Sequence, residues 1–103
     1  MKIVNIGEIP NKQYDVLGLV KGSVVRGIVK DIFTRWQNFI GVEMKKYKET
    51  LDVMRDTATK RMTDDAEILY ANAVLNVTYS SVHILPGIVE IVVYGTAVKF
   101  IDK

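Results

Sequence analysis

Residues 43–70, EMKKYKETLDVMRDTATKRMTDDAEILY, predict a single long amphipathic helix. Their apolar side chains recur at steps of three and four, which places them in one stripe along a helix. At 1.5 Å per residue the helix would span about 42 Å. A pattern like a capping box, Asp64 followed by Glu67, leaves open a kink near Thr63. The stripe consists of Met44, Tyr47, Leu51, Met54, Ala58, Met62, Ala66 and Leu69.

The segments before this helix predict strands and a shorter helix. Residues 3–6 and 14–29 are rich in Val, Ile and Leu and read as extended. The second segment is interrupted by glycines that indicate a bend, a bulge or a close backbone approach, and Gly22-Ser23 could instead turn it into a hairpin. Asp31 suits a helix N-cap, and we expect Gly41 to end or bend the short helix that follows. The glycines are Gly18, Gly22 and Gly27.

After the long helix, residues 74–84 and 88–101 predict two strands joined by the turn Leu85-Pro86-Gly87. Both faces of the last strand are mainly apolar, whereas a strand with one solvated face should alternate apolar with polar residues. One face can pack on the long helix. Because the other face needs a second cover, we expect a partner subunit to supply part of it, with Trp36 and Phe39 as aromatic contacts.

Length and composition limit the classes of function. With 103 residues the chain is expected to form one domain, residues 1–103. A net charge of +2 gives little attraction to nucleic acid or to acidic membranes. The absence of cysteine excludes disulfides and thiolate chemistry. No segment has the roughly 18 consecutive apolar residues that span a bilayer. We therefore expect a cytoplasmic protein without membrane contact.

Several short motifs lie in a fixed order along the chain. They are GLVKG at 18–22, IGVEM at 40–44 followed by Tyr47, Arg61-Met62, ANAV at 71–74 and EIVV at 90–93. The run of residues 94–98, YGTAV, which follows an Ala-Asn-Ala strand entry, is the most specific part. Together these motifs resemble the YbjQ-like family, which also carries a label for heavy-metal binding, and the match extends over nearly the whole chain.

The resemblance implies an α+β subunit like that of dodecin, with a small antiparallel sheet on one long helix and a shorter helix, in the order β-β-α-α-β-β. It also implies a ring of identical subunits, with a pentamer favoured, and no established activity. Motif residues that could serve an interface or a ligand are Gly41, Glu43, Tyr47, Arg61, Asn72, Tyr94, Gly95 and Thr96.

Two positions depart from the family pattern. Val42 stands where a second glycine usually precedes the glutamate, and Tyr70 stands where a glycine usually precedes the Ala-Asn pair. Because asparagine tolerates the left-handed conformation better than tyrosine does, we expect Asn72 to be the left-handed residue at the helix exit.

Metal binding is the chemistry that the family label suggests. Soft metals prefer thiolate, thioether or imidazole ligands, and methionines in the helix stripe are normally core fillers. A tight turn at Pro86-Gly87 would place His83 opposite Glu90, and a ring could bring several such pairs together. His83 and Glu90 are therefore the metal candidates. The simpler interpretation is a surface or interface histidine bonded to a carboxylate.

No pattern indicates catalysis. Ser81 and His83 share a strand face but have no orienting third group, and the glycine spacing fits neither a dinucleotide loop nor a P-loop. Lysines near the start of the long helix are offset by neighbouring acids, which argues against nucleic-acid binding. The sequence thus predicts a non-enzymatic homo-oligomer that requires no cofactor. The alternative is a sensor that binds a metal or small ligand between subunits, where Trp36 could stack on a flat ligand.

Overall fold

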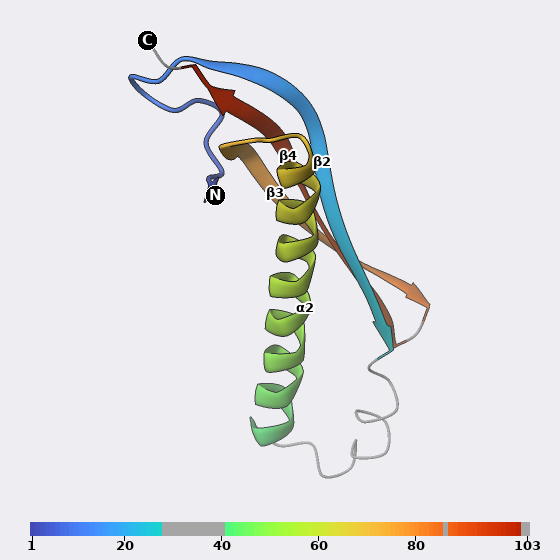
Figure 1. Ribbon diagram of the computed structural model, residues 1–103. Coiled ribbons are helices and arrows are strands. Elements are labelled where there is room, and N and C mark those ends of the chain that lie inside the picture. The colour runs from blue at the N-terminus through green and yellow to red at the C-terminus, as the bar shows by residue number, and fades with distance from the viewer. Residues whose placement is uncertain (28–40, 86, 102–103) are drawn as a thin grey trace.

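The protein is an α+β subunit in which one long helix lies across a twisted four-stranded sheet (Figure 1). The structure is a computed structural model that describes residues 1–27, 41–85 and 87–101, with the backbone alone for 41–47. The shorter helix predicted after Asp31 lies outside these residues. The elements are β1 (Lys2–Ile3), β2 (Tyr14–Gly27), α2 (Gly41–Ile68), β3 (Ala73–Leu85) and β4 (Ile88–Phe100).

The sheet has the strand order β1-β3-β4-β2. β4 is central and pairs antiparallel with both β2 and β3. The antiparallel direction of these pairs agrees with the prediction, whereas the strand order was not predicted. β1 instead pairs parallel to β3, so the prediction of a wholly antiparallel sheet is wrong. The physical reason is that the chain reaches β3 only after crossing the molecule along α2, and it then runs in the same direction as β1. The sheet is therefore mixed.

β2 is one continuous strand of 14 residues, and the alternative of a hairpin at Gly22-Ser23 is wrong. The pairing with β4 shifts between Val16 and Gly18, where one extra residue forms a bulge, and Gly18 has φ +143°. At Gly22 the strand meets the helix directly. A Cβ there would overlap the carbonyl oxygen of Ala58 and the amide nitrogen of Met62. The glycines thus mark a bulge and a close approach.

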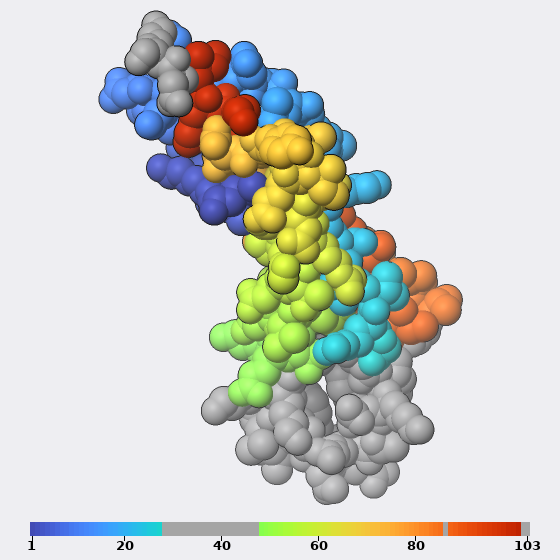
Figure 2. All heavy atoms as spheres, in the orientation of Figure 1, coloured from blue at the N-terminus to red at the C-terminus, as the bar shows by residue number. Residues whose placement is uncertain are grey.

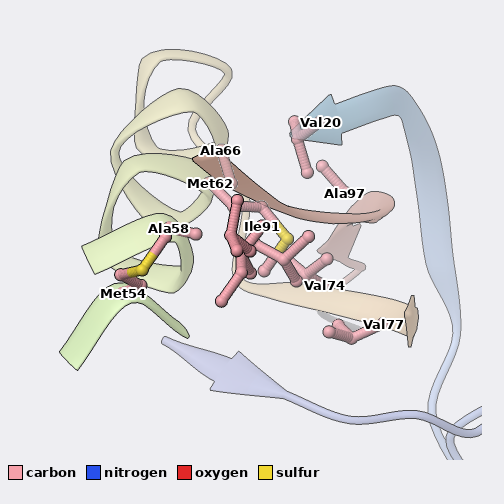
Figure 3. Packing of buried hydrophobic residues seen from close by; sticks show 11 residues of the cluster. Val20, Met54, Ala58, Met62, Ala66, Val74, Val77, Ile91 and Ala97 are labelled. Atoms are coloured by element: carbon pink, nitrogen blue, oxygen red, sulfur yellow. The ribbon is translucent and has the colours of Figure 1, made fainter. Parts of the chain in front are cut away.

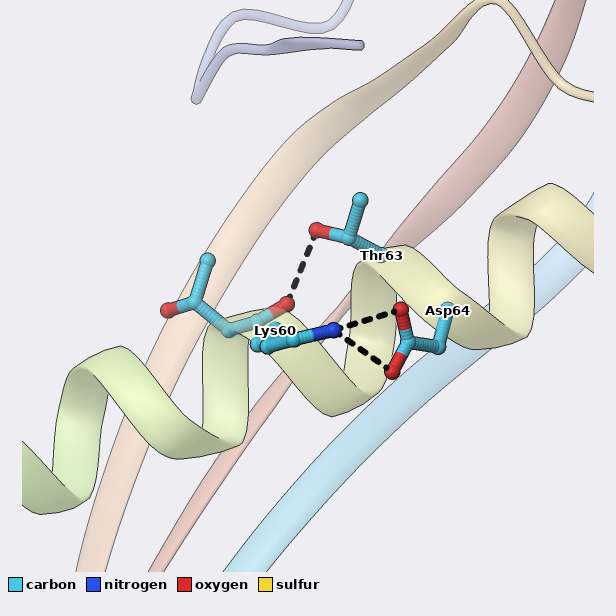
Figure 4. A network of polar contacts seen from close by, with 4 residues as sticks. Lys60, Thr63 and Asp64 are labelled. Carbon is cyan, nitrogen blue, oxygen red and sulfur yellow. Dashed lines mark hydrogen bonds and ion pairs between the residues drawn. The ribbon is translucent and has the colours of Figure 1, made fainter.

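α2 is a single helix without the kink that the sequence left open near Thr63 (Figure 1). Threonine in its interior is accommodated because the hydroxyl bonds back to the preceding turn: Thr63 Oγ1 donates to the carbonyl of Thr59 at 2.9 Å (Figure 4). Lys60 Nζ lies 3.2 Å from Asp64 Oδ1 on the solvated side. Gly41 begins this helix. No helix in the described part of the chain has the length and hydropathy needed to cross a bilayer.

The core forms where the apolar stripe of α2 meets the sheet (Figure 3). The predicted stripe is confirmed for its central members, whose side chains are completely buried, whereas Leu69 lies beyond the helix and is exposed. The side chains of Met44 and Tyr47 lie outside the described residues. The buried stripe members are Met54, Ala58, Met62 and Ala66, and the strands contribute Val20, Val74, Val77, Val89, Ile91, Val93 and Ala97.

The helix exit departs from the prediction. Tyr70, not Asn72, takes the left-handed conformation, with φ 62°. The Tyr70 amide donates to the Glu67 carbonyl at 2.9 Å, and the Ala71 amide donates to the Ala66 carbonyl at 3.2 Å. These two bonds form a Schellman motif, which fixes the residue after the helix as left-handed whatever its side chain. Tyrosine thus occupies a position that favours glycine.

Replacing Tyr70 with glycine should therefore stabilise the protein by about 0.5–1 kcal/mol, because glycine adopts this conformation without a Cβ clash. The gain outweighs the loss of an exposed contact in which Lys99 Nζ lies 6.0 Å from the tyrosine ring centroid. Chemical denaturation at fixed protein concentration measures the change. Ile68→Gly is the matched control and should cost about 0.5–1 kcal/mol, because Ile68 is helical and exposed. Equal losses in both variants would contradict a strained Tyr70.

The subunit is elongated rather than round (Figure 2). It measures 62 × 22 × 16 Å, and its radius of gyration is 17.3 Å. A compact domain of this length has a radius of about 13 Å. At least as many large apolar side chains are exposed as are buried among the described residues. The isolated subunit therefore leaves much of its apolar surface uncovered.

Candidate functional site

The candidate site is the side of the sheet opposite α2, which we call the outer face. Alternation along β4 defines it, because Val89, Ile91 and Val93 point to the helix and are buried. The residues between them point away, and the strand register extends this face onto β2 and β3. Its open part comprises Leu19, Lys21, Ser23 and Val25 of β2, Glu90, Val92, Tyr94 and Thr96 of β4, and Thr78, Ser80 and Val82 of β3.

One end of the outer face is covered by the N-terminal segment. Ile9 packs there with Leu75 and Val98 in a small second core, flanked by Val4 and Tyr14. The sequence did not predict this cover, because residues 4–13 show no regular apolar period. Beyond this second core, none of the described residues covers the outer face.

The open part mixes apolar side chains with hydroxyl groups and carries little charge. The side chain of Leu19 is 71% exposed and that of Val25 is 54% exposed. The remaining members are serine, threonine, valine and tyrosine, except for Lys21 and Glu90. Large exposed apolar patches on soluble proteins mark interaction sites. This arrangement suits contact with another protein surface better than contact with water.

Two of the motif residues, Arg61 and Asn72, form hydrogen bonds with residues that are distant in sequence. Arg61 on α2 donates from Nη1 to the carbonyl of Ser23 on β2 at 2.7 Å. The side-chain Oδ1 of Asn72 accepts from the Phe100 backbone amide at 2.6 Å, and the backbone amide of Asn72 donates to the Val98 carbonyl at 2.9 Å. All three contacts satisfy backbone hydrogen-bonding groups. A structural role therefore explains Arg61 and Asn72 at these positions without a ligand.

The other motif residues are divided between the two sides of the sheet. Tyr94 and Thr96 belong to the outer face, whereas Gly95 lies on the helix side of the sheet, against β3. A Cβ on Gly95 would lie 2.6 Å from Val74 Cγ1 and 2.9 Å from the Leu75 carbonyl oxygen, so close packing accounts for the glycine.

Three further motif residues, Gly41, Glu43 and Tyr47, lie at the start of α2, where the structure describes the backbone alone. Gly41 begins α2 and Glu43 follows in its first turn. The side chains of Glu43 and Tyr47, and the aromatic candidates Trp36 and Phe39, lie outside the described residues.

The predicted pairing of His83 with Glu90 is wrong. His83 lies opposite Val89, on the helix side, whereas Glu90 lies opposite Val82, on the outer face. The pairing Leu85 with Ile88 follows the tight turn, but a bulge between His83 and Leu85 then shifts the register by one residue. A shift of one residue moves a side chain to the opposite face.

The donors needed for a heavy metal do not come together in the described part of the chain. It contains no group of three or more histidine, cysteine, aspartate or glutamate side chains able to hold a metal ion. The thioethers of Met54 and Met62 are completely buried among hydrocarbon. Among the described residues of one subunit, the donor set therefore does not fit a soft metal.

The described residues form a groove that the sequence did not predict. It has a volume of about 470 Å³ and is lined by Ile3, Val4, Asn5, Ile6, Val77 and Tyr79. The Tyr79 hydroxyl lies 2.8 Å from Thr59 Oγ1, so this side chain bridges β3 to α2. No local pattern could have revealed the groove, because it forms where residues far apart in sequence meet.

Comparison with known proteins identifies the family. The model of the YbjQ family, described as "putative heavy-metal-binding", matches residues 1–101. The chain belongs to the YbjQ-like family. Relatives named UPF0145 protein are 40% identical in Helicobacter hepaticus, covering 99% of this chain and all of that protein, and 38% identical in Clostridium novyi, covering 98% and all.

The fold of this YbjQ-like protein is also found in a crystal structure. That structure is of a protein of unknown function from Pediococcus pentosaceus, assigned to the DUF74 family. The TM-score is 0.70 and 98% of each chain is covered, at 18% sequence identity. At this identity the likeness concerns the fold alone, and the relatives' names state no activity.

Proposed function

We propose that this protein acts as a non-enzymatic building block of a ring of identical subunits, for which the family resemblance favours five copies. The observation that carries the proposal is the open outer face, whose apolar residues have no cover among the described residues. The elongated shape supports it, because a thin subunit gains buried area only by packing beside another.

The chemistry of the outer face also favours a second copy over a charged ligand. On this face Lys21 lies opposite Tyr94 and Glu90 lies opposite Val25, so the two charges are four residues apart along the paired strands. They are also of opposite sign. A face of this kind can meet an identical or neighbouring apolar surface without bringing like charges together. Stable interfaces bury about 800 Å² on each partner.

Leu19→Lys tests the proposal. Leu19 is already exposed in the subunit, so lysine should leave the fold intact while placing a charge in the contact. Light scattering and native mass spectrometry at micromolar concentration should show the wild type as a ring and the variant as species of at most two copies. Val53→Lys is the matched control, because Val53 is exposed on α2, and its ring should persist. A monomeric wild type, or an unchanged ring in Leu19→Lys, contradicts the proposal.

A second candidate is a small ligand held between subunits, which the groove beside Tyr79 favours over a metal. Apolar walls with a few polar groups are typical of small-molecule sites. Native mass spectrometry of the protein purified from its own host should then show added mass on the ring. A bare ring that shows no mass shift with flavin or metal contradicts this second function.

A further inference from the structure

The subunit has a second exposed surface, on the helix side of β3. Residues 79, 81 and 83 pair with β4 residues that point to α2 and are buried beneath it. Directly paired residues point to the same side of a sheet. These three β3 residues are nevertheless exposed, because α2 lies mainly over β2 and β4. We call them, Tyr79, Ser81 and His83, together with Ile6 of the N-terminal segment, the β3 strip.

The β3 strip is continuous with the groove beside Tyr79. Ile6 and Tyr79 line both surfaces, and each is 48% exposed. The hydrogen bond from Tyr79 to Thr59 fixes the tyrosine ring at the junction. Neither the strip nor the groove lining contains lysine, arginine, aspartate or glutamate. Strip and groove together thus form an uncharged, partly apolar surface with a hollow in it.

A ring of more than two copies requires two different contact surfaces on each subunit. If the outer face met the outer face of a second copy, the contact would be isologous and would stop at a dimer. The outer face must therefore meet another surface of the neighbour. The β3 strip lies on the opposite side of the sheet, so one subunit can use both surfaces at the same time.

Other exposed apolar residues away from the outer face are less suitable. On α2, Val53 has Glu49 and Asp56 as neighbours at helical spacing, so charges surround it. At the helix exit, Lys99 Nζ lies 6.0 Å from the Tyr70 ring centroid. Burying either site would remove charged groups from water, which is costly unless they are paired. The uncharged β3 strip avoids this cost.

We propose that the outer face of one copy packs on the β3 strip of the next copy, head to tail around the ring. The contact rests on the proposed function and names its second surface. The strip has no acidic group to repel Glu90, and His83 is a base that suits this carboxylate. Neighbouring strands are rotated by about 20–25°, so the outer face on β2 and the strip on β3 are inclined to each other. A repeated contact between inclined surfaces can close into a ring.

The same contact gives the groove an occupant. Side chains of the neighbour's outer face would enter it beside Tyr79, and the groove would then have no room for the small ligand considered above.

Crosslinking between single-cysteine variants tests this contact, because the natural chain contains no cysteine. Ser81→Cys and His83→Cys mark the strip, Ser23→Cys and Val25→Cys mark the outer face, and Val53→Cys on α2 is the control. All five positions are exposed, so each variant should fold. Each strip variant is co-expressed with each outer-face variant and treated with a short bis-maleimide. Covalent dimers should form in at least one of the four mixtures, with only background amounts in any variant alone or mixed with the control.

A chain that carries both cysteines of the reactive pair provides the second measurement. It should give a ladder of crosslinked species whose largest member has as many chains as the ring seen by native mass spectrometry. A ladder that runs beyond that number, or dimers from one variant alone, overturns the head-to-tail contact. No crosslink in any of the four mixtures, in chains that still form rings, overturns this contact and leaves the ring itself standing. A monomeric wild type rejects both proposals.

Discussion

Replacing Gly22 with alanine should cost about 3 kcal/mol of unfolding free energy, close to the upper end of overpacking effects. The added methyl group would meet the backbone of α2 at Ala58 and Met62, not the movable end of a side chain. The helix must then shift away from β2, and the bonds from Arg61 to the Ser23 carbonyl and from the Lys21 amide to Asp65 must stretch with it. One methyl group therefore disturbs the whole contact between helix and sheet.

Urea denaturation followed by circular dichroism measures this loss at a fixed protein concentration, since association adds to apparent stability. Gly27→Ala is the matched control on the same strand, because a Cβ at Gly27 meets nothing within 4 Å. That variant should change stability by at most about 0.5 kcal/mol. If Gly22→Ala were as stable as Gly27→Ala, the close approach of β2 to α2 would be wrong.

The sequence predicted those parts of the fold that depend on local periodicity. The stripe through Met54, Ala58 and Met62 could be found because helical spacing of apolar residues continues over many turns. The glycines of β2 were harder to interpret. A close approach at Gly22 was among the alternatives, but choosing it over a hairpin requires knowing that α2 crosses β2 at that residue.

The predictions were wrong where the surrounding chain imposes a backbone conformation or a strand register that the local sequence does not indicate. Asparagine tolerates a left-handed backbone better than tyrosine does, yet the two Schellman bonds impose that conformation on Tyr70. The register of β3 with β4 was correct at Leu85 and Ile88, and a single bulge then carried His83 to the other face. A bulge leaves no clear signal in the amino-acid sequence, so the metal candidates could not be tested without the structure.

The candidate site was predicted in outline and missed in detail. Apolar residues on both faces of the last strand correctly indicated that one face lacks a cover within α2. The small core around Ile9 and the β3 strip could not be predicted, because they depend on where the N-terminal segment and α2 cross the sheet. Such long-range contacts join residues that are about 70 positions apart, and no local pattern records them.

Met62→Ala should destabilise the protein by about 3 kcal/mol, because a completely buried side chain is lost at the centre of the helix stripe. Figure 3 shows this side chain beside Ile91, between α2 and the sheet. The cavity cannot close easily, since the backbone of α2 at residue 62 is held against Gly22 and neither element can move inward further. Denaturation midpoints of the wild type and the variant measure the loss.

Met62→Leu distinguishes packing from chemistry of the thioether. Leucine keeps most of the volume and removes the sulfur, so a core role predicts a cost below about 1.5 kcal/mol. Both variants should be compared at the same protein concentration, with and without a soft metal ion. If Met62→Leu lost as much stability as Met62→Ala, or if metal stabilised the wild type alone, the sulfur would have a role that burial does not supply. Because Met62 is sealed from solvent on every side, we expect neither result.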